Sequence, residues 1–482
     1  MTQEALVGLE EQSIWKYFGE ISAIPRESGN EAGVRSYLID FAKHHGLAYI
    51  VDATGNVIIR KPATAGNETK PSVALQGHMD MVCVKDEGVE HDFAVDPIRL
   101  VRDGDILSAD GTTLGADNGI ALAIILSILA DSEAVHGPLE GIFTVEEETG
   151  LTGAFGIEEQ HIESRLLLNL DSDEEGVFYI GCAGGVETVA TFALDWQQPA
   201  KGSIAFSLSA DGMRGGHSGA EIHTQRANAI KAVARPLAHL DSLSLYSATG
   251  GTRRNVIPST ATIGFTVLAK DAEAVKEAVR AAQEELSGEY AYSDPEITLH
   301  LKEKPLPQAV LSEELSGAII RALHGALHGV DAMSMSLEDV VETSTNLALL
   351  EMDTEHLVVT ASHRSSILSA RDDVATRFAH IFSLVKAEIF HGGGYPSWEP
   401  NPDSAITKFC AQAYQELTKK EPKITAIHAG LECGIINSKV PGMDSVSFGP
   451  NMWDIHSTKE RLSIASAERI EAFTRHLLSI IE

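Results

Sequence analysis

The stretch Val73-Ala74-Leu75-Gln76-Gly77-His78-Met79-Asp80 decides the fold class that the sequence predicts. Its apolar first half predicts a buried strand, and its polar second half begins where that strand should end. Outward from it, the apolar runs GIFTV (141–145) and LLLNL (166–170) alternate with amphipathic segments, such as a helix expected from about Asn118. This alternation predicts an α/β fold with βαβ units and a largely parallel central sheet flanked by helices.

The C-terminal part of the chain repeats this pattern, whereas the middle differs. A helix over residues 403–418, a strand at DSVSF (444–448) and a helix from residue 464 match the character of the N-terminal part. In the middle, IAFSLSA (204–210) and TIGFTVLA (262–269) alternate apolar and polar residues, as strands do when one face of the sheet is wet. The middle region is therefore expected to form an α+β domain of its own.

Glycine-rich hinges mark the limits of this inserted domain. They are GCAGG at residues 181–185 and HGGGYPSWEPNPDS at residues 391–404. We expect one discontinuous domain from residues 1–185 and 398–482, and an inserted domain over 186–397. Within the insert, a β-α-β-β-α-β motif is expected over 204–301 and a partial second copy over 312–390. Its helices are expected near residues 220–240, 271–287 and 312–327.

The composition excludes several classes of partner. The 482 residues include 37 basic and 69 acidic ones, and the net charge of −32 repels nucleic acid and anionic lipid headgroups. The longest apolar run, residues 120–130, is shorter than the roughly 20 residues that a membrane span needs and predicts a buried helix. The N-terminus lacks the features of a signal peptide, and the four cysteines show no C-x-x-C spacing. We therefore expect a cytoplasmic protein with no nucleic-acid or membrane partner.

Ligand-type side chains follow the predicted strands. In an α/β sheet the ligand site lies beyond the carboxyl ends of the strands, so these side chains should gather at one edge. A further carboxylate stands at the expected N-cap of the helix near Asn118. Taken singly, each is more simply a hydrogen-bonded core histidine, a helix cap or a solvated carboxylate. The set is His78, Asp117, Glu148, Asp171 and His456.

The chemistry of this set indicates a metal site. Three adjacent carboxylates at residues 146–148 repel one another unless a cation compensates them. Two imidazoles and three carboxylates without thiolates suit zinc, cobalt or manganese at a catalytic site. Five ligands are too many for one open tetrahedral ion, and they fit two ions that share a carboxylate. We therefore predict a two-metal hydrolytic centre, with Asp80 holding the second ring nitrogen of His78.

Five motifs, in order along nearly the whole chain, resemble one family of enzymes: QGHMDMV, LGADNGIA, TVEEETGLTGA, LNLDS and the segment around His456. This is the zinc peptidase and deacylase family that includes aminoacylase, glutamate-type carboxypeptidases and succinyl-diaminopimelate desuccinylase. With GCAGG and MRGGHSG added, the chain is most similar to the Xaa-His dipeptidases of that family. The resemblance implies hydrolysis of small dipeptides with two Zn²⁺ ions per subunit, for which Co²⁺ or Mn²⁺ could substitute.

The resemblance also divides the ligands between the two ions. It implies that His78 and Asp171 bind one zinc and that Glu148 and His456 bind the other. Asp117 would bridge the two ions.

Further roles follow from the same resemblance. Asp80 would orient His78, and Glu147 would be the general base. His217, in MRGGHSG, would reach the active site of a partner subunit and stabilise the oxyanion. The inserted domain would then be a lid and the dimerisation surface of a homodimer.

Three residues of the predicted lid and pocket would contact the substrate. Asn255 and Arg364 resemble lid residues that hold the substrate backbone and its C-terminal carboxylate. Gly430 resembles a residue lining the substrate pocket, and the role of the nearby Glu432 is left open.

Competing functions have weaker support in the sequence. An N-acyl amino acid deacylase or a carboxypeptidase could use the same dizinc centre, and a non-catalytic metal-binding protein is disfavoured by the presence of Glu147. A serine hydrolase would need a glycine where Ala220 follows Gly-His-Ser-Gly. His324 and His328 share a helix face but lack the glutamate of a zincin motif between them.

Overall fold

The computed structural model describes residues 4–9 and 11–482, and its contacts divide the chain into two compact units. The first unit contains the chain up to Gly181, Trp398–Ala426 and Leu431–Glu482, and the second contains Cys182–Ser397 and Ile427–Gly430. Compared with the boundaries expected from the sequence, residues 182–185 and 427–430 lie with the inserted part. Gly184 and Gly185 do so because they pair with β18 as the first residues of a strand of the second unit.

The first unit is built on one mixed sheet. The central strands β6, β3, β7 and β21 run parallel to one another, and the pairs β1–β2, β2–β6 and β21–β8 are antiparallel. The predicted α/β fold class is thus confirmed, with antiparallel strands added at both sides of the parallel core. In spatial order the strands are β1 (Ala48–Val51), β2 (Val57–Lys61), β6 (Leu139–Thr144), β3 (Val73–His78), β7 (Leu166–Asn169), β21 (Asp444–Ser447), β8 (Val177–Cys182) and β20 (Lys423–Ile427).

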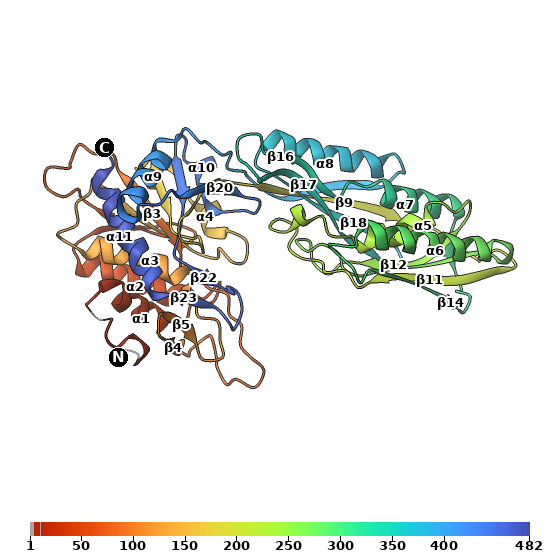
Figure 1. Cartoon of the computed structure of the whole chain (residues 1–482), viewed down its shortest axis with the longest axis horizontal. Helices are drawn as coiled ribbons and strands as arrows, with labels where there is room; N and C mark the ends of the chain where they lie inside the picture. The colour runs from red at the N-terminus through yellow and green to blue at the C-terminus, as the bar shows by residue number, and fades with distance from the viewer. Residues whose placement is uncertain (1–3, 10) are drawn as a thin grey trace. The chain divides into compact units, whose positions relative to one another are not determined.

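Helices cover both faces of this sheet. On one face, α3 packs against β3 because Gly77 leaves room for the side chains of Asn118 and Ala121. The apolar run of this helix is fully buried, as the sequence predicts, because α1 and α11 cover it (Figure 1). The helices are α1 (Ser13–Ser22), α2 (Ala32–His44), α3 (Ala116–Ala130), α4 (Thr152–Gly156), α9 (Ala405–Thr418), α10 (Glu432–Lys439) and α11 (Ile464–Ile480).

A small antiparallel sheet lies beside the main sheet in the first unit. It contains β22 (Met452–Trp453), β23 (Arg461–Ser463), β5 (Ile106–Ala109) and β4 (Leu100–Asp103). The turn between β22 and β23 carries His456, whose backbone has a positive φ of 62°. This sheet therefore brings the C-terminal histidine next to the segment that leads into α3.

The second unit is built on one antiparallel sheet. In spatial order its strands are β14 (Thr298–Lys304), β11 (Ser203–Asp211), β13 (Ala261–Leu268), β12 (Ser244–Gly250), β17 (Val341–Met352), β18 (His356–Ser365), β9 (Gly184–Ala193) and β19 (Glu388–Tyr395), with β16 (Gly329–Met333) paired to β17. The short strands β10 (Trp196–Gln197) and β15 (Val310–Leu311) pair separately. The alternating stretches of the sequence are β11 and β13, which pair in register from Ser203–Leu268 to Ala210–Ala261.

Helices form one layer on this second sheet (Figure 1). They contact one another in the order α6, α5, α7 and α8, and their apolar faces join the sheet in one core. The helix expected over residues 220–240 is shorter than predicted, because α5 begins after Asn228 caps the backbone N–H groups of Ile230 and Lys231. The helices are α5 (Ala229–Leu237), α6 (Ala272–Glu289), α7 (Glu313–Gly325) and α8 (Leu368–Ser383).

The second unit contains the same topology twice. In chain order, β11, α5, β12, β13, α6 and β14 form one module, and β9, α7, β17, β18, α8 and β19 form the other. In both modules the strands lie in the spatial order fourth, first, third, second. The second copy is therefore not partial, as the sequence suggested, because its first strand, β9, precedes the whole first module.

No helix in the described part of the chain is long and apolar enough to cross a membrane.

Candidate metal centre

Three neighbouring parallel strands deliver the predicted ligands to one edge of the sheet. β3 ends at His78, β6 ends just before residues 146–148, and β7 ends just before Asp171. Because β6, β3 and β7 are adjacent and parallel, their carboxyl ends meet at the same edge. His78 is 1% exposed and Asp171 is 9% exposed, so the protein covers most of this edge.

Asp117 lies at the centre of the site. The sequence suggested that Asp117 caps a helix, but the N-cap of α3 is Gly115, whose φ of 68° suits a glycine. Asp117 instead has an extended ψ of 106° and directs its carboxylate between two histidines. Its Oδ1 lies 3.0 Å from Nε2 of His78, and its Oδ2 lies 3.0 Å from Nε2 of His456. The two oxygens of one carboxylate therefore face two different imidazoles.

The remaining carboxylates complete two groups around Asp117. Oδ1 of Asp171 lies 3.4 Å from Nε2 of His78, and Oε1 of Glu148 lies 3.0 Å from Nε2 of His456. Each group contains one imidazole, one carboxylate of its own and one oxygen of Asp117. The structure thus brings together all of the side chains that the sequence placed at this centre.

The donor chemistry of this cluster fits bound cations. Nδ1 of His78 faces Oδ1 of Asp80 at 3.2 Å, and because a carboxylate only accepts, Nδ1 carries the proton of the neutral ring. The lone pair of Nε2 then points at oxygens of Asp117 and Asp171, which repels unless a cation lies there. Oε1 of Glu148 is also buried, and its 3.0 Å approach to Nε2 of His456 lacks the geometry of a hydrogen bond, so no described residue donates to it. Ligand atoms of His78, Asp117 and Glu148 lie within 4.8 Å of one another, a spacing that can hold a metal ion.

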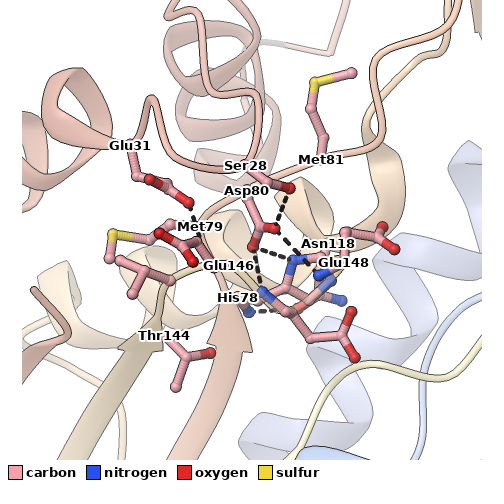
Figure 2. Close-up of polar contacts among 12 residues, drawn as sticks. Ser28, Glu31, His78, Met79, Asp80, Met81, Asn118, Thr144, Glu146 and Glu148 are labelled. Atoms are coloured by element: carbon pink, nitrogen blue, oxygen red, sulfur yellow. Dashed lines mark hydrogen bonds and ion pairs between the residues drawn. The ribbon is translucent and has the colours of Figure 1, made fainter. Parts of the chain in front are cut away.

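Asp80 accepts several hydrogen bonds next to these candidate ligands (Figure 2). Besides His78, it accepts hydrogen bonds from the hydroxyl of Ser28 at 2.7 Å and from the backbone N–H groups of Glu147 and Glu148 at 3.1 and 3.2 Å. Burial by itself raises the pKa of Asp80, but the hydrogen bonds and the charge of His78 outweigh it and lower the pKa to about 2. Asp80 therefore connects the end of β3 to the segment that follows β6.

Glu147 has the surroundings of a general base. Its carboxylate is half-buried, and no described residue donates a hydrogen bond to it. Burial raises the pKa of Glu147 well above its ordinary value, and the carboxylates of Asp171, Glu432 and Glu148 add to this effect against the charge of His78. A carboxylate in this position can take a proton without giving up a structural contact.

Two residues that the sequence analysis missed hold the backbone of the site. The buried Arg26 donates to the carbonyl oxygens of Met79 and Asp80 at 3.2 and 2.7 Å, and also to that of Gly115. The buried Glu460 accepts the backbone N–H groups of Leu114, Gly115 and Asp117 at 2.8, 2.9 and 3.2 Å. Neither residue stands in a local pattern that distinguishes it from a surface charge, so the sequence alone carries no signal for them.

Glu432, whose role the sequence left open, is buried and bonds to the strands that carry the candidate ligands. It accepts hydrogen bonds from Nε2 of Gln76 at 2.5 Å and from the hydroxyl of Thr144 at 2.8 Å. Burial and the charge of Asp171 raise its pKa to about 7, although His78 and the two hydrogen bonds act in the opposite direction. Gln76 lies two residues before His78 on the same face of β3, so Glu432 supports the strand that presents this histidine.

The other predicted site residues lie in the second unit. Nδ1 of His217 accepts the backbone N–H groups of Ala220 and Gly219 at 3.0 and 3.3 Å, which leaves the ring proton on Nε2. Burial lowers the pKa of His217, and the positive charge of Arg364 lowers it further. Arg364 is itself 8% exposed, whereas Asn255 is exposed.

Gly430 was predicted to line the substrate pocket. A Cβ atom at this position would lie 2.9 Å from Cε2 of Tyr395. Gly430 therefore packs closely against the aromatic ring of Tyr395 in its own unit.

Comparisons with known proteins identify the family of the chain. Residues 74–481 match the model of peptidase family M20/M25/M40. The chain is 39% identical over 476 residues to the cytosol non-specific dipeptidase of Escherichia coli K12, covering 98% of each protein. Its structure is similar to the crystal structure of aminoacylhistidine dipeptidase from Vibrio alginolyticus, with a TM-score of 0.91 over 98% of this chain and 96% of that one. The sequence identity between the two is 38%.

A more distant structure shows the fold alone. A tripeptidase from Staphylococcus aureus is 17% identical, with a TM-score of 0.57 over 98% of both chains. The family match spans most of the sequence, including every residue of the candidate metal centre. The chain therefore belongs to peptidase family M20/M25/M40.

Proposed function

We propose that this protein is a metal-dependent dipeptidase that hydrolyses the amide bond of small dipeptides, Xaa-His dipeptides among them. The observation that carries the proposal is the position of Asp117 between His78 and His456, with the unpaired carboxylate of Glu147 beside them. The substrate class is supported by the two relatives, which are a cytosol non-specific dipeptidase and an aminoacylhistidine dipeptidase.

Two divalent ions, Zn²⁺ with Co²⁺ or Mn²⁺ as substitutes, are proposed as the cofactors. His78 and Asp171 would hold one, Glu148 and His456 would hold the other, and Asp117 would bridge them. Bound ions would supply Lewis acidity, which polarises the scissile carbonyl and makes the attacking water more acidic. The mixed imidazole and carboxylate set without thiolates supports these metals.

In the proposed reaction Glu147 moves the proton. Its carboxylate accepts a proton from the attacking water and later gives it to the leaving amine nitrogen, so no net proton is lost. Asp80 keeps the backbone of Glu147 and the ring of His78 in place through the hydrogen bonds described above. Glu147 is the proposed catalytic residue, and Asp80 is a positioning residue.

Residues of the second unit are proposed to bind the substrate. His217 would donate its Nε2–H to the oxyanion, since its own loop already occupies Nδ1. Arg364 would pair with the C-terminal carboxylate, and Asn255 would contact the peptide backbone. Gly430 would line the pocket that receives the second residue.

We further propose a cytoplasmic homodimer formed through the second unit, in which His217 serves the site of the partner chain. The likeness of the segment at residues 213–219 to a partner-reaching segment in the family supports the dimer. The cytosolic name of the E. coli relative and the net charge of −32 support the location and the absence of nucleic-acid and membrane partners.

A substrate panel tests the proposed function. The purified protein is assayed with dipeptides ending in histidine, other dipeptides, tripeptides and N-acyl amino acids, before and after chelation and after adding back zinc. We expect cleavage of dipeptides that is lost on chelation and restored by zinc. Cleavage of N-acyl amino acids alone would show a deacylase, and turnover that resists chelation with no bound metal would refute the metal centre.

A further inference from the structure

Arg364, on β18, is a buried cation without an anionic partner. Its side chain is 8% exposed, and no carboxylate of the described chain lies within ion-pair distance of it. Its Nε is buried and finds no acceptor among the described residues. A buried charge without a counter-charge is costly, so the second unit is built here to receive an anion.

The hydroxyl of Tyr395, the last residue of β19, points to Arg364. Nη1 of Arg364 donates to Oη of Tyr395 at 2.6 Å, so this oxygen serves as an acceptor and its own proton remains available. Across the described chain, no residue accepts that proton. The guanidinium and the phenol therefore present two neighbouring donors with free hydrogen-bonding capacity.

Two glycines leave the space that the ring of Tyr395 occupies. A Cβ at Gly185 would lie 2.6 Å from Cζ of the ring, and a Cβ at Gly430 would lie 2.9 Å from Cε2. On the backbone side, Nη1 of Arg371 donates to the carbonyl oxygens of Tyr395 and Gly185 at 2.8 and 3.1 Å. The slot for the ring is thus formed by residues far apart in the sequence.

The surrounding charges favour an anion at these donors. Burial lowers the pKa of both His217 and His428, and the positive charge of Arg364 lowers it further, so both rings lie near the guanidinium. The carboxylate whose charge acts on Tyr395 is that of Glu187, and it pairs with Arg254 at 2.9 Å. Glu221, whose charge acts on His217, pairs with Arg226 at 2.6 Å, so these two carboxylates are each compensated by an arginine.

We propose that Tyr395 is a substrate-binding residue, which donates its hydroxyl proton to the C-terminal carboxylate of the dipeptide that Arg364 pairs with. This inference rests on the proposed function and deepens it. It gives Gly430 a physical role, which is to leave room for the ring of Tyr395. It also requires a ligand with a free carboxylate at this end.

The test compares a dipeptide that the wild type cleaves with its C-terminal amide, using Tyr395→Phe. Loss of a hydrogen bond to a charged group should raise KM for the free acid by about tenfold, with kcat changed less than about twofold. KM for the amide should change less than about twofold. Tyr246→Phe is the matched control, because its hydroxyl bonds to the backbone oxygen of Phe206 in the same unit, and it should leave both KM values unchanged.

A second variant and a binding measurement separate the outcomes. Gly430→Ala should displace the ring and raise KM for the free acid in the same direction. In a Glu147→Gln background, calorimetry should show the same loss of dipeptide binding on Tyr395→Phe. Equal changes for acid and amide, or none for either, would overturn the role of Tyr395 while leaving the dipeptidase intact. A wild type that neither cleaves nor binds dipeptides would overturn both proposals.

Discussion

Glu147 and Glu148 are adjacent in sequence but have different surroundings. Oε1 of Glu148 lies 3.0 Å from Nε2 of His456, whereas the carboxylate of Glu147 contacts no described donor. Their backbone N–H groups both donate to the carboxylate of Asp80. One residue therefore fixes the backbone from which both side chains extend. At the scale of single residues, the proposed metal ligand and the proposed general base are thus separated by one position in the chain.

The first prediction concerns Glu147→Gln. Removing the base should lower kcat by about 10²- to 10⁴-fold, because the amide cannot take a proton from water. Elemental analysis should still find two metal ions per chain, since Glu147 is not among the proposed ligands. Activity equal to wild type would discard the base, and loss of metal would make Glu147 a ligand.

The second prediction concerns Asp117→Ala. Because the oxygens of Asp117 face both histidines, this change should remove both ions. Asp171→Ala is the matched variant, since Asp171 lies near His78 only, and it should weaken one ion selectively. Metal content per chain, measured after dialysis, distinguishes the two, and loss of only one ion from Asp117→Ala would refute the bridge.

At the scale of elements, the segment that carries His217 is held at both ends by one residue. Asp294, which is fully buried, accepts the backbone N–H groups of Arg214 and Ala227 at 2.8 Å each. Within the segment, the carboxylate of Glu221 accepts the N–H of His217 at 2.7 Å. The loop is therefore ordered by carboxylates that bind its backbone.

The third prediction concerns Asp294→Asn. An amide presents one accepting oxygen where the carboxylate presents two, so a buried N–H should lose its partner. The free energy of unfolding should fall by about 1–3 kcal/mol in a denaturant titration. Asp211→Asn, at an exposed position of the same unit, should change it by less than about 0.5 kcal/mol. Equal effects of the two variants would refute the role of Asp294.

The fourth prediction concerns how stability depends on pH through His363, which lies on β18 between β17 and β9. Nδ1 and Nε2 of His363 pair with the hydroxyls of Thr345 and Thr188 at 3.1 and 2.9 Å. Burial, with the charge of His391 added, lowers the pKa of His363 to about 3. The unfolded chain therefore takes up a proton below about pH 6.5 that the folded chain refuses, so stability falls from there toward pH 3.

A matched variant checks this sign. In His363→Gln the decline between pH 6.5 and 4 should be shallower by up to about 1.4 kcal/mol per pH unit, because one titrating group is missing. Denaturant titrations at several pH values measure it. A decline as steep as that of the wild type would show that His363 does not titrate as proposed.

At the scale of the whole molecule, the two modules of the second unit join through equivalent strands. β12 and β17 are the second strands of their modules, and they pair antiparallel through Thr249–Glu351 and Gly250–Leu350. One chain thus contains, within itself, an edge-to-edge pairing of two similar modules. This strand edge is already used inside the chain, so a homodimer would need another surface of the second unit.

The fifth prediction tests the proposed homodimer by mixing two inactive variants. Glu147→Ala lacks the base, and His217→Ala lacks the oxyanion donor. If His217 serves the partner chain, mixed dimers should regain one intact site, and an equal mixture should recover about one quarter of wild-type activity. Sedimentation should show dimers. The two variants are mixed, unfolded and refolded together so that mixed dimers form. If the mixture regains no activity, His217 belongs to the site of its own chain.

The sequence by itself determined the class of fold and which polar side chains meet at one edge of the sheet. The candidate ligands stand directly after apolar runs, and a strand ends at a place that local hydrophobicity defines. The positions of His78, Glu148 and Asp171 at the sheet edge were therefore predictable from their neighbours in the chain. The alternation of β11 and β13 was readable for the same reason. The twofold topology was only partly so, because β9 is separated from the rest of its module by the whole first module.

Only the tertiary structure decided which distant residues support the site. Glu460 binds the backbone before Asp117 across more than three hundred positions, Arg26 bonds to the end of β3, and Tyr395 fits between Gly185 and Gly430. Asp117 does not cap the helix as local rules predicted, because its two carboxylate oxygens face two imidazoles instead. Such contacts depend on how the strands and helices of each unit pack, and that information lies in the whole unit rather than in any one segment.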